Sequence, residues 1–129
     1  LGAEGVQIGS RFVASEESSA HQAFKQAVID AEEGDTMLTL KELAPVRLIK
    51  NEFFQQVQNA YIKGTTKEEL QQILGRARAK RGMFEGDLIE GELEIGQVSG
   101  MIKNLKPAQE IVEELWQEFE NHKQALIEI

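Results

Sequence analysis

The chain has one credible β-strand, and that strand is very short. Residues Val6 to Ile8 are largely apolar, with β-branched ends and flanking glycines, a pattern that favours a buried strand. A lone strand cannot satisfy its own backbone hydrogen-bonding groups, so it needs partner strands. Because the sequence opens directly on this strand and without a methionine, we expect it to be a piece of a longer protein.

A small-residue turn and a predicted helix follow the strand. The turn is Gly9-Ser10-Arg11-Phe12, and the helix is expected to start at Ser15 or Ser18 and to end at Gly34. Its apolar stripe is formed by Phe24, Ala27, Val28 and Ala31. Strand, tight loop and helix together form one β/α unit.

The rest of the chain is predominantly helical in pattern. Residues 36–40 form a possible short strand, and Pro45 suits the first turn of a helix. That helix has the apolar stripe Val46, Ile49, Phe53, Val57 and Ala60.

Three further segments complete the predicted elements. Thr66 and Glu69 form a capping-box signature for a helix that Gly82 should end. The acidic stretch 85–94 is predicted to be a surface loop. A short helix over 97–103 and a last helix opened by Pro107 follow.

Composition limits the partners of the chain. With 14 Lys and Arg against 22 Asp and Glu in 129 residues, the net charge of -8 opposes binding to nucleic acid or to an anionic membrane. There is no cysteine, which excludes disulfides and thiolate metal sites. No apolar run is long enough for a membrane span, and we expect a cytoplasmic protein.

Two segments resemble one enzyme family. Residues 2–21 (GAEGVQIGSRFVASEESSAH) are similar to the last strand and following loop of nitronate monooxygenases, formerly 2-nitropropane dioxygenases, and of flavin-dependent enoyl-acyl-carrier-protein reductases. Residues 95–102 (IGQVSGMI) resemble a later segment of the same family. Ser10 stands where the family usually has threonine, and Ile95 where alanine is common.

The resemblance implies an α/β parent, a (β/α)8 TIM barrel that binds FMN. Residues 1–34 would be the last strand and helix of the barrel, and residues 35–129 a helical C-terminal region. The parent would be an FMN-dependent oxidoreductase acting on a small-molecule substrate. It would oxidise a nitronate with oxygen or, alternatively, transfer hydride to an enoyl thioester or quinone. The family's catalytic histidine belongs to an earlier loop, so we expect this chain to be inactive alone, with no catalytic residue.

The same resemblance assigns cofactor-binding residues. It gives the backbone N–H groups of Gly9 and Ser10, with the Ser10 hydroxyl, to the FMN phosphate, and Ile8 to the edge of the flavin. A Gly-Ser pair by itself is more often only a tight turn. Gln97 either lines the substrate side of the flavin or satisfies the local backbone. The glycine-rich loop that would complete the phosphate site is not in this chain, so we expect FMN to be absent or weakly bound.

Other polar residues have simpler explanations. Arg11 either contacts a phosphate or pairs with Glu16 or Glu17, and His21 is expected to form a structural hydrogen bond or cap. The basic residues 76–81 suit a solvated helix terminus. The acidic loop lacks the ligand spacing of a calcium site, so no metal is expected.

Two further expectations concern assembly. Surfaces that barrel neighbours would cover predict a homo-oligomer. The amphipathic helices also allow a different interpretation, a stand-alone helical interaction module, although such a bundle has no use for a β/α unit.

Overall fold

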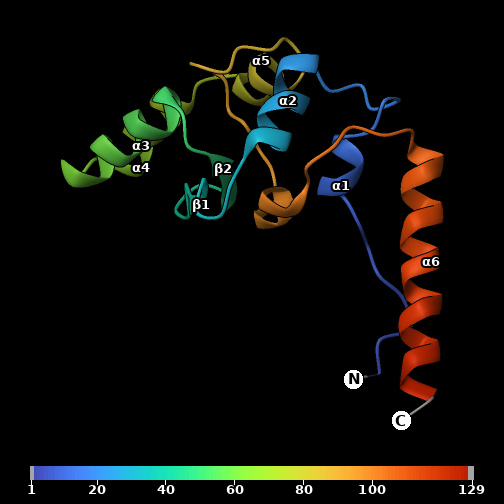
Figure 1. Ribbon diagram of the computed structural model, residues 1–129. Coiled ribbons are helices and arrows are strands. Elements are labelled where there is room, and N and C mark those ends of the chain that lie inside the picture. Colours follow the sequence, from blue (N-terminus) through green and yellow to red (C-terminus); the bar gives the residue numbers. More distant parts are fainter. Residues whose placement is uncertain (1, 128–129) are drawn as a thin grey trace.

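Residues 2–9 run as an extended segment without strand pairing (Figure 1). The computed structural model describes residues 2–127. Val6 is 86% exposed and Ile8 is 39% exposed, so the predicted buried strand is exposed in this structure. The part of the chain that is described provides no neighbouring strand here, and an extended backbone without a ladder gains no burial.

Two helices follow the extended segment. Helix α1 (Ser10–Val13) is a single turn at the Gly-Ser position, and α2 (Gln22–Asp30) begins later than predicted. The imidazole Nδ1 of His21 accepts a hydrogen bond from the Ala23 N–H at 3.1 Å and so caps α2. The structural role predicted for His21 is confirmed. The helix ends at Asp30, and Gly34 takes a positive φ in the turn beyond it rather than acting as its cap.

A small antiparallel sheet contains β1 (Thr36–Thr39) and β2 (Val46–Ile49). The possible strand at 36–40 is therefore confirmed, whereas the predicted helical start at Pro45 is wrong. The helix in question, α3 (Glu52–Ile62), begins only after Asn51, whose side chain accepts a hydrogen bond from the Phe54 N–H at 3.0 Å. Phe53, Val57 and Ala60 are buried on α3 as the stripe predicted.

Residues 93–95 extend the sheet beside β2. The Ile49 N–H donates to the Leu93 carbonyl at 3.0 Å, and the Ile95 N–H donates to the Arg47 carbonyl at 3.1 Å. The predicted surface loop is therefore wrong at its end, where Leu93 is 2% exposed and Glu92 is 8% exposed.

Helices α4 (Lys67–Leu74) and α5 (Arg78–Met83) replace the single predicted helix. The capping box of Thr66 and Glu69 is confirmed. Gly75 ends α4 with a φ of 64°, while Gly82 lies inside α5. A Cβ on Gly82 would approach the Glu92 carbonyl oxygen to 2.6 Å, so this glycine allows close packing rather than stopping a helix.

The side chain of Arg78 is largely covered by other residues and only 17% exposed, so it is not part of a solvated helix terminus. Its guanidinium donates to the carbonyl oxygens of Ile73 at 2.9 Å, Leu74 at 2.8 Å and Glu90 at 2.8 Å. It also lies over the Phe53 ring, 4.5 Å from the centroid. The prediction for residues 76–81 is wrong at Arg78, because residues 90–92 fold back over the start of α5.

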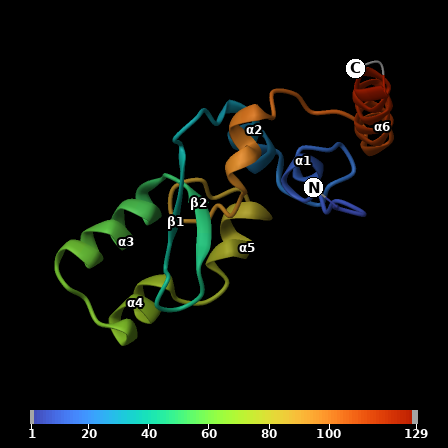
Figure 2. The same cartoon turned by 90° about the horizontal axis from the view of Figure 1, so that it is seen from below.

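The last elements are a 3-10 helix, η1 (Gln97–Met101), and the long helix α6 (Ala108–Ile127), both close to their predicted positions. Figures 1 and 2 show α6 standing apart from the lobe that holds the sheet and the other helices, with residues 2–9 beside it. Within residues 2–127, no helix combines the length and apolar character needed to cross a membrane.

Two groups of buried side chains form the core. The first joins Phe24 and Val28 of α2 to Leu93, Ile95 and Ile102, and the second joins Leu48 to residues of α3. The sequence-based division at residue 34 stays a prediction, and its outer ends, residues 1 and 128–129, lie outside the described residues.

Candidate functional site

The Gly-Ser turn and the Gly-Gln segment meet in space. The Ser10 Oγ accepts a hydrogen bond from the Gly96 N–H at 3.0 Å, across 86 positions of sequence. A Cβ on Gly96 would lie 2.6 Å from the Ser10 Oγ, so a side chain there would push the two segments apart. The Gly-Ser turn and the Gly-Gln segment therefore form one site at the start of α1.

This site presents unused hydrogen-bond donors. Phe12 and Val13 donate to the Gly9 carbonyl, but the N–H groups of Gly9, Ser10 and Arg11 make no hydrogen bond within residues 2–127. A Cβ on Gly9 would meet nothing within 4 Å, so the space beside these donors is open. The Ser10 oxygen accepts from Gly96, which leaves its hydroxyl proton free to donate. Successive N–H groups with a hydroxyl are suited to an anion.

A hollow of about 490 Å³ adjoins the turn. Apolar side chains from η1 and α6 form its other walls, and Val98 is 48% exposed and Met101 81% exposed there. Its lining comprises Gln7, Ile8, Gly9, Ser10, Arg11, Val98, Met101, Ile102 and Leu115. The hollow thus combines polar backbone donors at one end with an apolar surface.

Arg11 does not form the ion pair expected as one of its two roles, and a contact of its guanidinium with a phosphate stays a prediction. Its guanidinium donates to the Asn104 Oδ1 at 2.7 Å, to the Asn104 carbonyl at 3.1 Å and to the Ala14 carbonyl at 3.4 Å. These contacts tie the turn to the segment before α6. Within residues 2–127, the Arg11 guanidinium forms no ion pair with Glu16 or Glu17, because Asn104 and the Ala14 carbonyl occupy its donors.

Gln97 is exposed and makes no side-chain hydrogen bond within the described residues. It does not cap η1, which removes the local structural explanation. It follows Gly96 directly but is not among the side chains that line the hollow. Its place on the substrate side stays a prediction.

A buried lysine behind the turn was not anticipated. Lys25 on α2 is 4% exposed, and its Nζ donates to the Ser15 carbonyl at 2.7 Å and to the Glu16 carbonyl at 3.1 Å. These bonds hold the chain that leaves α1. Lys25 lies beside the apolar stripe of α2, and the sequence does not predict its burial because a lysine at such a position normally extends its ammonium group into solvent.

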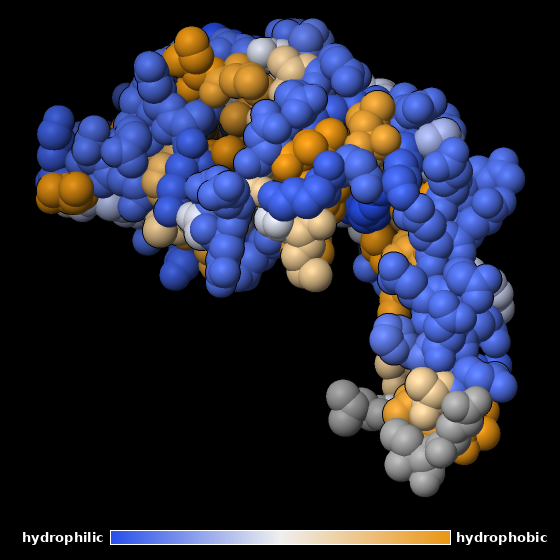
Figure 3. Space-filling model, in the orientation of Figure 1, coloured by the Kyte–Doolittle hydropathy of each residue, from blue (hydrophilic) through white to orange (hydrophobic). Residues whose placement is uncertain are grey.

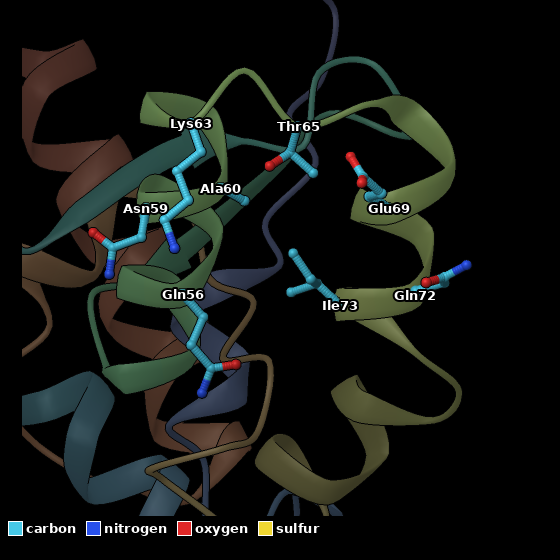
Figure 4. Close-up of a pocket in the computed structure, with 8 residues that line it drawn as sticks. All are labelled: Gln56, Asn59, Ala60, Lys63, Thr65, Glu69, Gln72 and Ile73. Carbon is cyan, nitrogen blue, oxygen red and sulfur yellow. The ribbon is translucent and has the colours of Figure 1, made fainter.

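Other groups offer less chemistry. His122 lies on the exposed surface of α6, and residues 2–127 contain no cluster of three or more His, Cys, Asp or Glu side chains that could hold a metal ion. A wider hollow of about 610 Å³ lies between α3 and α4 (Figure 4). The one carboxylate among its lining side chains is Glu69, which is engaged in the capping box.

The chain matches the family model for nitronate monooxygenase over residues 1–118. A "Probable nitronate monooxygenase" of Staphylococcus saprophyticus is 34% identical over 106 residues, which are 81% of this chain and 30% of that protein. One of Bacillus subtilis is 56% identical over 39 residues, which are 30% of this chain and 11% of that protein. The chain therefore spans a minor part of the length of these relatives.

A solved structure matches the whole arrangement. FabK from Thermotoga maritima superposes on 97% of this chain, and on 40% of its own, with a TM-score of 0.87 and 33% identity. A stand-alone helical bundle does not describe the chain, because β1, β2 and residues 93–95 form a sheet between the helices. The match over 118 of its 129 residues shows that this chain belongs to the nitronate monooxygenase family.

Proposed function

We propose that this chain forms one wall of the FMN phosphate site of a TIM-barrel oxidoreductase of the nitronate monooxygenase type. The observation that carries the proposal is the set of free donors at Gly9, Ser10 and Arg11 beside an open space. Family membership supports a flavin as the ligand.

Each residue has a definite part in this proposal. The N–H groups of Gly9 and Ser10 and the Ser10 hydroxyl donate to the phosphate, and Gly96 holds the serine oxygen in place. Ile8, which borders the hollow, contacts the edge of the flavin. Gln97, which follows Gly96 directly, faces the substrate. FMN supplies the redox chemistry, while these residues bind and orient it.

The reaction we favour is oxidation of a small nitronate, because the relatives of S. saprophyticus and B. subtilis are probable nitronate monooxygenases. The second candidate is the reduction of an enoyl thioester. The observation behind it is the extent of the FabK match, which covers nearly the whole chain at a similar identity.

We further propose that the chain alone is inactive and holds FMN weakly. No side chain that exchanges a proton near neutral pH lines the hollow beside the turn. The relative of S. saprophyticus is more than three times as long as the segment that matches this chain. Most of its barrel therefore lies outside the matched segment.

We also propose that the chain self-associates through the surface of α6. A hollow of about 650 Å³ separates residues 3–8 from this helix, and Trp116 (64% exposed) and Phe119 (54% exposed) line it. Figure 3 shows hydrophobic surface on this side of α6. A second copy that covers these side chains removes apolar area from water.

The phosphate site can be tested by titrating the 15N-labelled chain with FMN and with riboflavin. We expect the amide signals of residues 9–11 to shift with FMN but not with riboflavin, which lacks the phosphate. Ser10→Ala should weaken FMN binding by about tenfold or more, as loss of a hydrogen bond to a charged group does. Ser19→Ala, at an exposed serine without such a bond, is the matched control. Unchanged signals at residues 9–11 under saturating FMN would refute the proposal.

A further inference from the structure

Two carboxylates share one face of the small sheet. Glu94 lies opposite Leu48 in an antiparallel bridge, so the two side chains lie on the same face. Glu92 precedes Glu94 by two positions and shares that face, about 7 Å away along the segment. Leu48 belongs to the second core group, whereas Leu93 and Ile95, on the other face, belong to the first.

These carboxylates line an otherwise apolar pocket. The pocket has a volume of about 300 Å³, and its aliphatic walls come from the β1–β2 connection and the end of α4. They include Leu40, Leu43, Val46 and Leu74. A charged group on such a surface lacks the hydration that it has in water.

Glu92 has no partner for its charge. Glu92 as a whole residue is 8% exposed, and its carboxylate makes no hydrogen bond or ion pair within residues 2–127. The nearby cations are engaged elsewhere. Arg78 of α5 bonds Glu90 and three carbonyls, and Arg47 of β2 donates to the Thr36 carbonyl at 3.1 Å and to its hydroxyl at 3.2 Å.

We propose that this pocket binds a primary alkylammonium ion, with Glu92 as the counter-ion and the aliphatic walls around the alkyl chain. An ammonium supplies both the charge and the donors that the buried carboxylate lacks. Glu94 adds negative potential at the same face, and the leucines and Val46 account for the requirement for an alkyl chain. A free amine or a lysine side chain could bring this group.

The test is an NMR titration of the 15N-labelled protein with n-butylammonium at pH 8. We expect a Kd on the order of 1 mM, as is usual for so small a ligand, with shifts at residues 40–46, 74 and 92–94. Nα-acetyl-lysine methylamide is the second probe. Binding of n-butylammonium alone identifies a free amine as the ligand, and binding of both identifies a lysine side chain.

Controls separate charge from apolar contact. Glu92→Gln should weaken binding at least tenfold, while Glu118→Gln, which makes the same charge change on the exposed surface of α6, should leave it unchanged. 1-Butanol matches the alkyl chain without the charge and should bind at least tenfold more weakly. Equal binding of 1-butanol, or no loss in Glu92→Gln, would overturn the proposal.

The pH dependence gives an independent readout. Burial, and then the charge of Glu94, raise the pKa of Glu92 to about 7, with Arg78 acting in the opposite direction. Because the cation binds the ionised carboxylate, we expect binding about tenfold tighter at pH 8 than at pH 6. Affinity that does not change over this interval would contradict the assignment to Glu92.

Discussion

Replacing Glu92 by glutamine should stabilise the fold, and the gain should depend on pH. The glutamate pKa rises on folding from 4.5 to about 7, chiefly because the side chain is buried. A carboxyl whose folded pKa is raised binds its proton more tightly in the native state. Its ionisation therefore destabilises the folded protein progressively between pH 4.5 and about 7, and the loss is complete above that range.

The size of the effect follows from the same two values. At 1.36 kcal/mol for each tenfold change in proton affinity, the rise from 4.5 to about 7 corresponds to about 3 kcal/mol above pH 7. Water that enters the adjoining pocket reduces this, so we expect Glu92→Gln to gain about 1–3 kcal/mol at pH 8. At pH 5 the gain should be below about 1 kcal/mol, because the glutamate is then protonated in the native state.

Urea unfolding of both proteins at pH 5 and pH 8, followed by circular dichroism, measures the difference. Glu118→Gln, on the exposed surface of α6, controls for the change in net charge. A variant that is less stable than the wild type at pH 8, or a gain that is equal at both pH values, would refute the reasoning.

Four further substitutions test other parts of the structure. Lys25→Met leaves the Ser15 and Glu16 carbonyls without their donor, so urea unfolding should show a loss of about 2–3 kcal/mol. Gly96→Ala places a Cβ against the Ser10 Oγ and should cost about 1–3 kcal/mol, with shifted amide signals at residues 9–11; an unperturbed spectrum would contradict the contact. Thr66→Ala removes the capping box and should cost about 1 kcal/mol, whereas Thr65→Ala, outside the box, should cost less. Trp116→Lys should lower self-association in analytical ultracentrifugation, and Gln117→Lys, which adds the same charge at the next position, should not.

Sequence-based predictions are confirmed for features whose interactions involve only neighbouring residues. The Thr66–Glu69 capping box and the helix opened by Pro107 depend on groups within one turn, and both form as predicted. The His21 cap is of the same kind, since its partner is two residues away. Such features need no information from distant parts of the chain.

The helix predicted at the position of β2 is wrong, because the apolar residues there have the spacing of a helix. Val46 and Ile49 continue the three-and-four spacing of Phe53 and Val57, so the pattern predicts one helical stripe over residues 46–60. Pairing with β1 on one side and with residues 93–95 on the other makes residues 46–49 a strand. These partners lie up to about 50 positions away, and a local pattern does not contain them.

In the candidate site, too, the sequence predicts some residues, whereas their contacts are known only from the fold. Family resemblance alone identified the Gly9-Ser10 turn and the Gly96-Gln97 segment, but not that they touch. The hydrogen bond from Gly96 to Ser10, the anchoring of Arg11 by Asn104 and the burial of Lys25 all depend on contacts across the fold.

The sequence by itself determined the family, the Thr66–Glu69 capping box, the structural role of His21 and the apolar stripe of α3, because each depends on residue identity and short spacing. Only the tertiary structure decided that residues 2–9 have no strand partner within residues 2–127 and that the side chain of Glu92 is largely buried. A strand needs a neighbour, and the pKa of a carboxyl depends on what surrounds it. Both are set by segments that folding brings together from far apart in the chain.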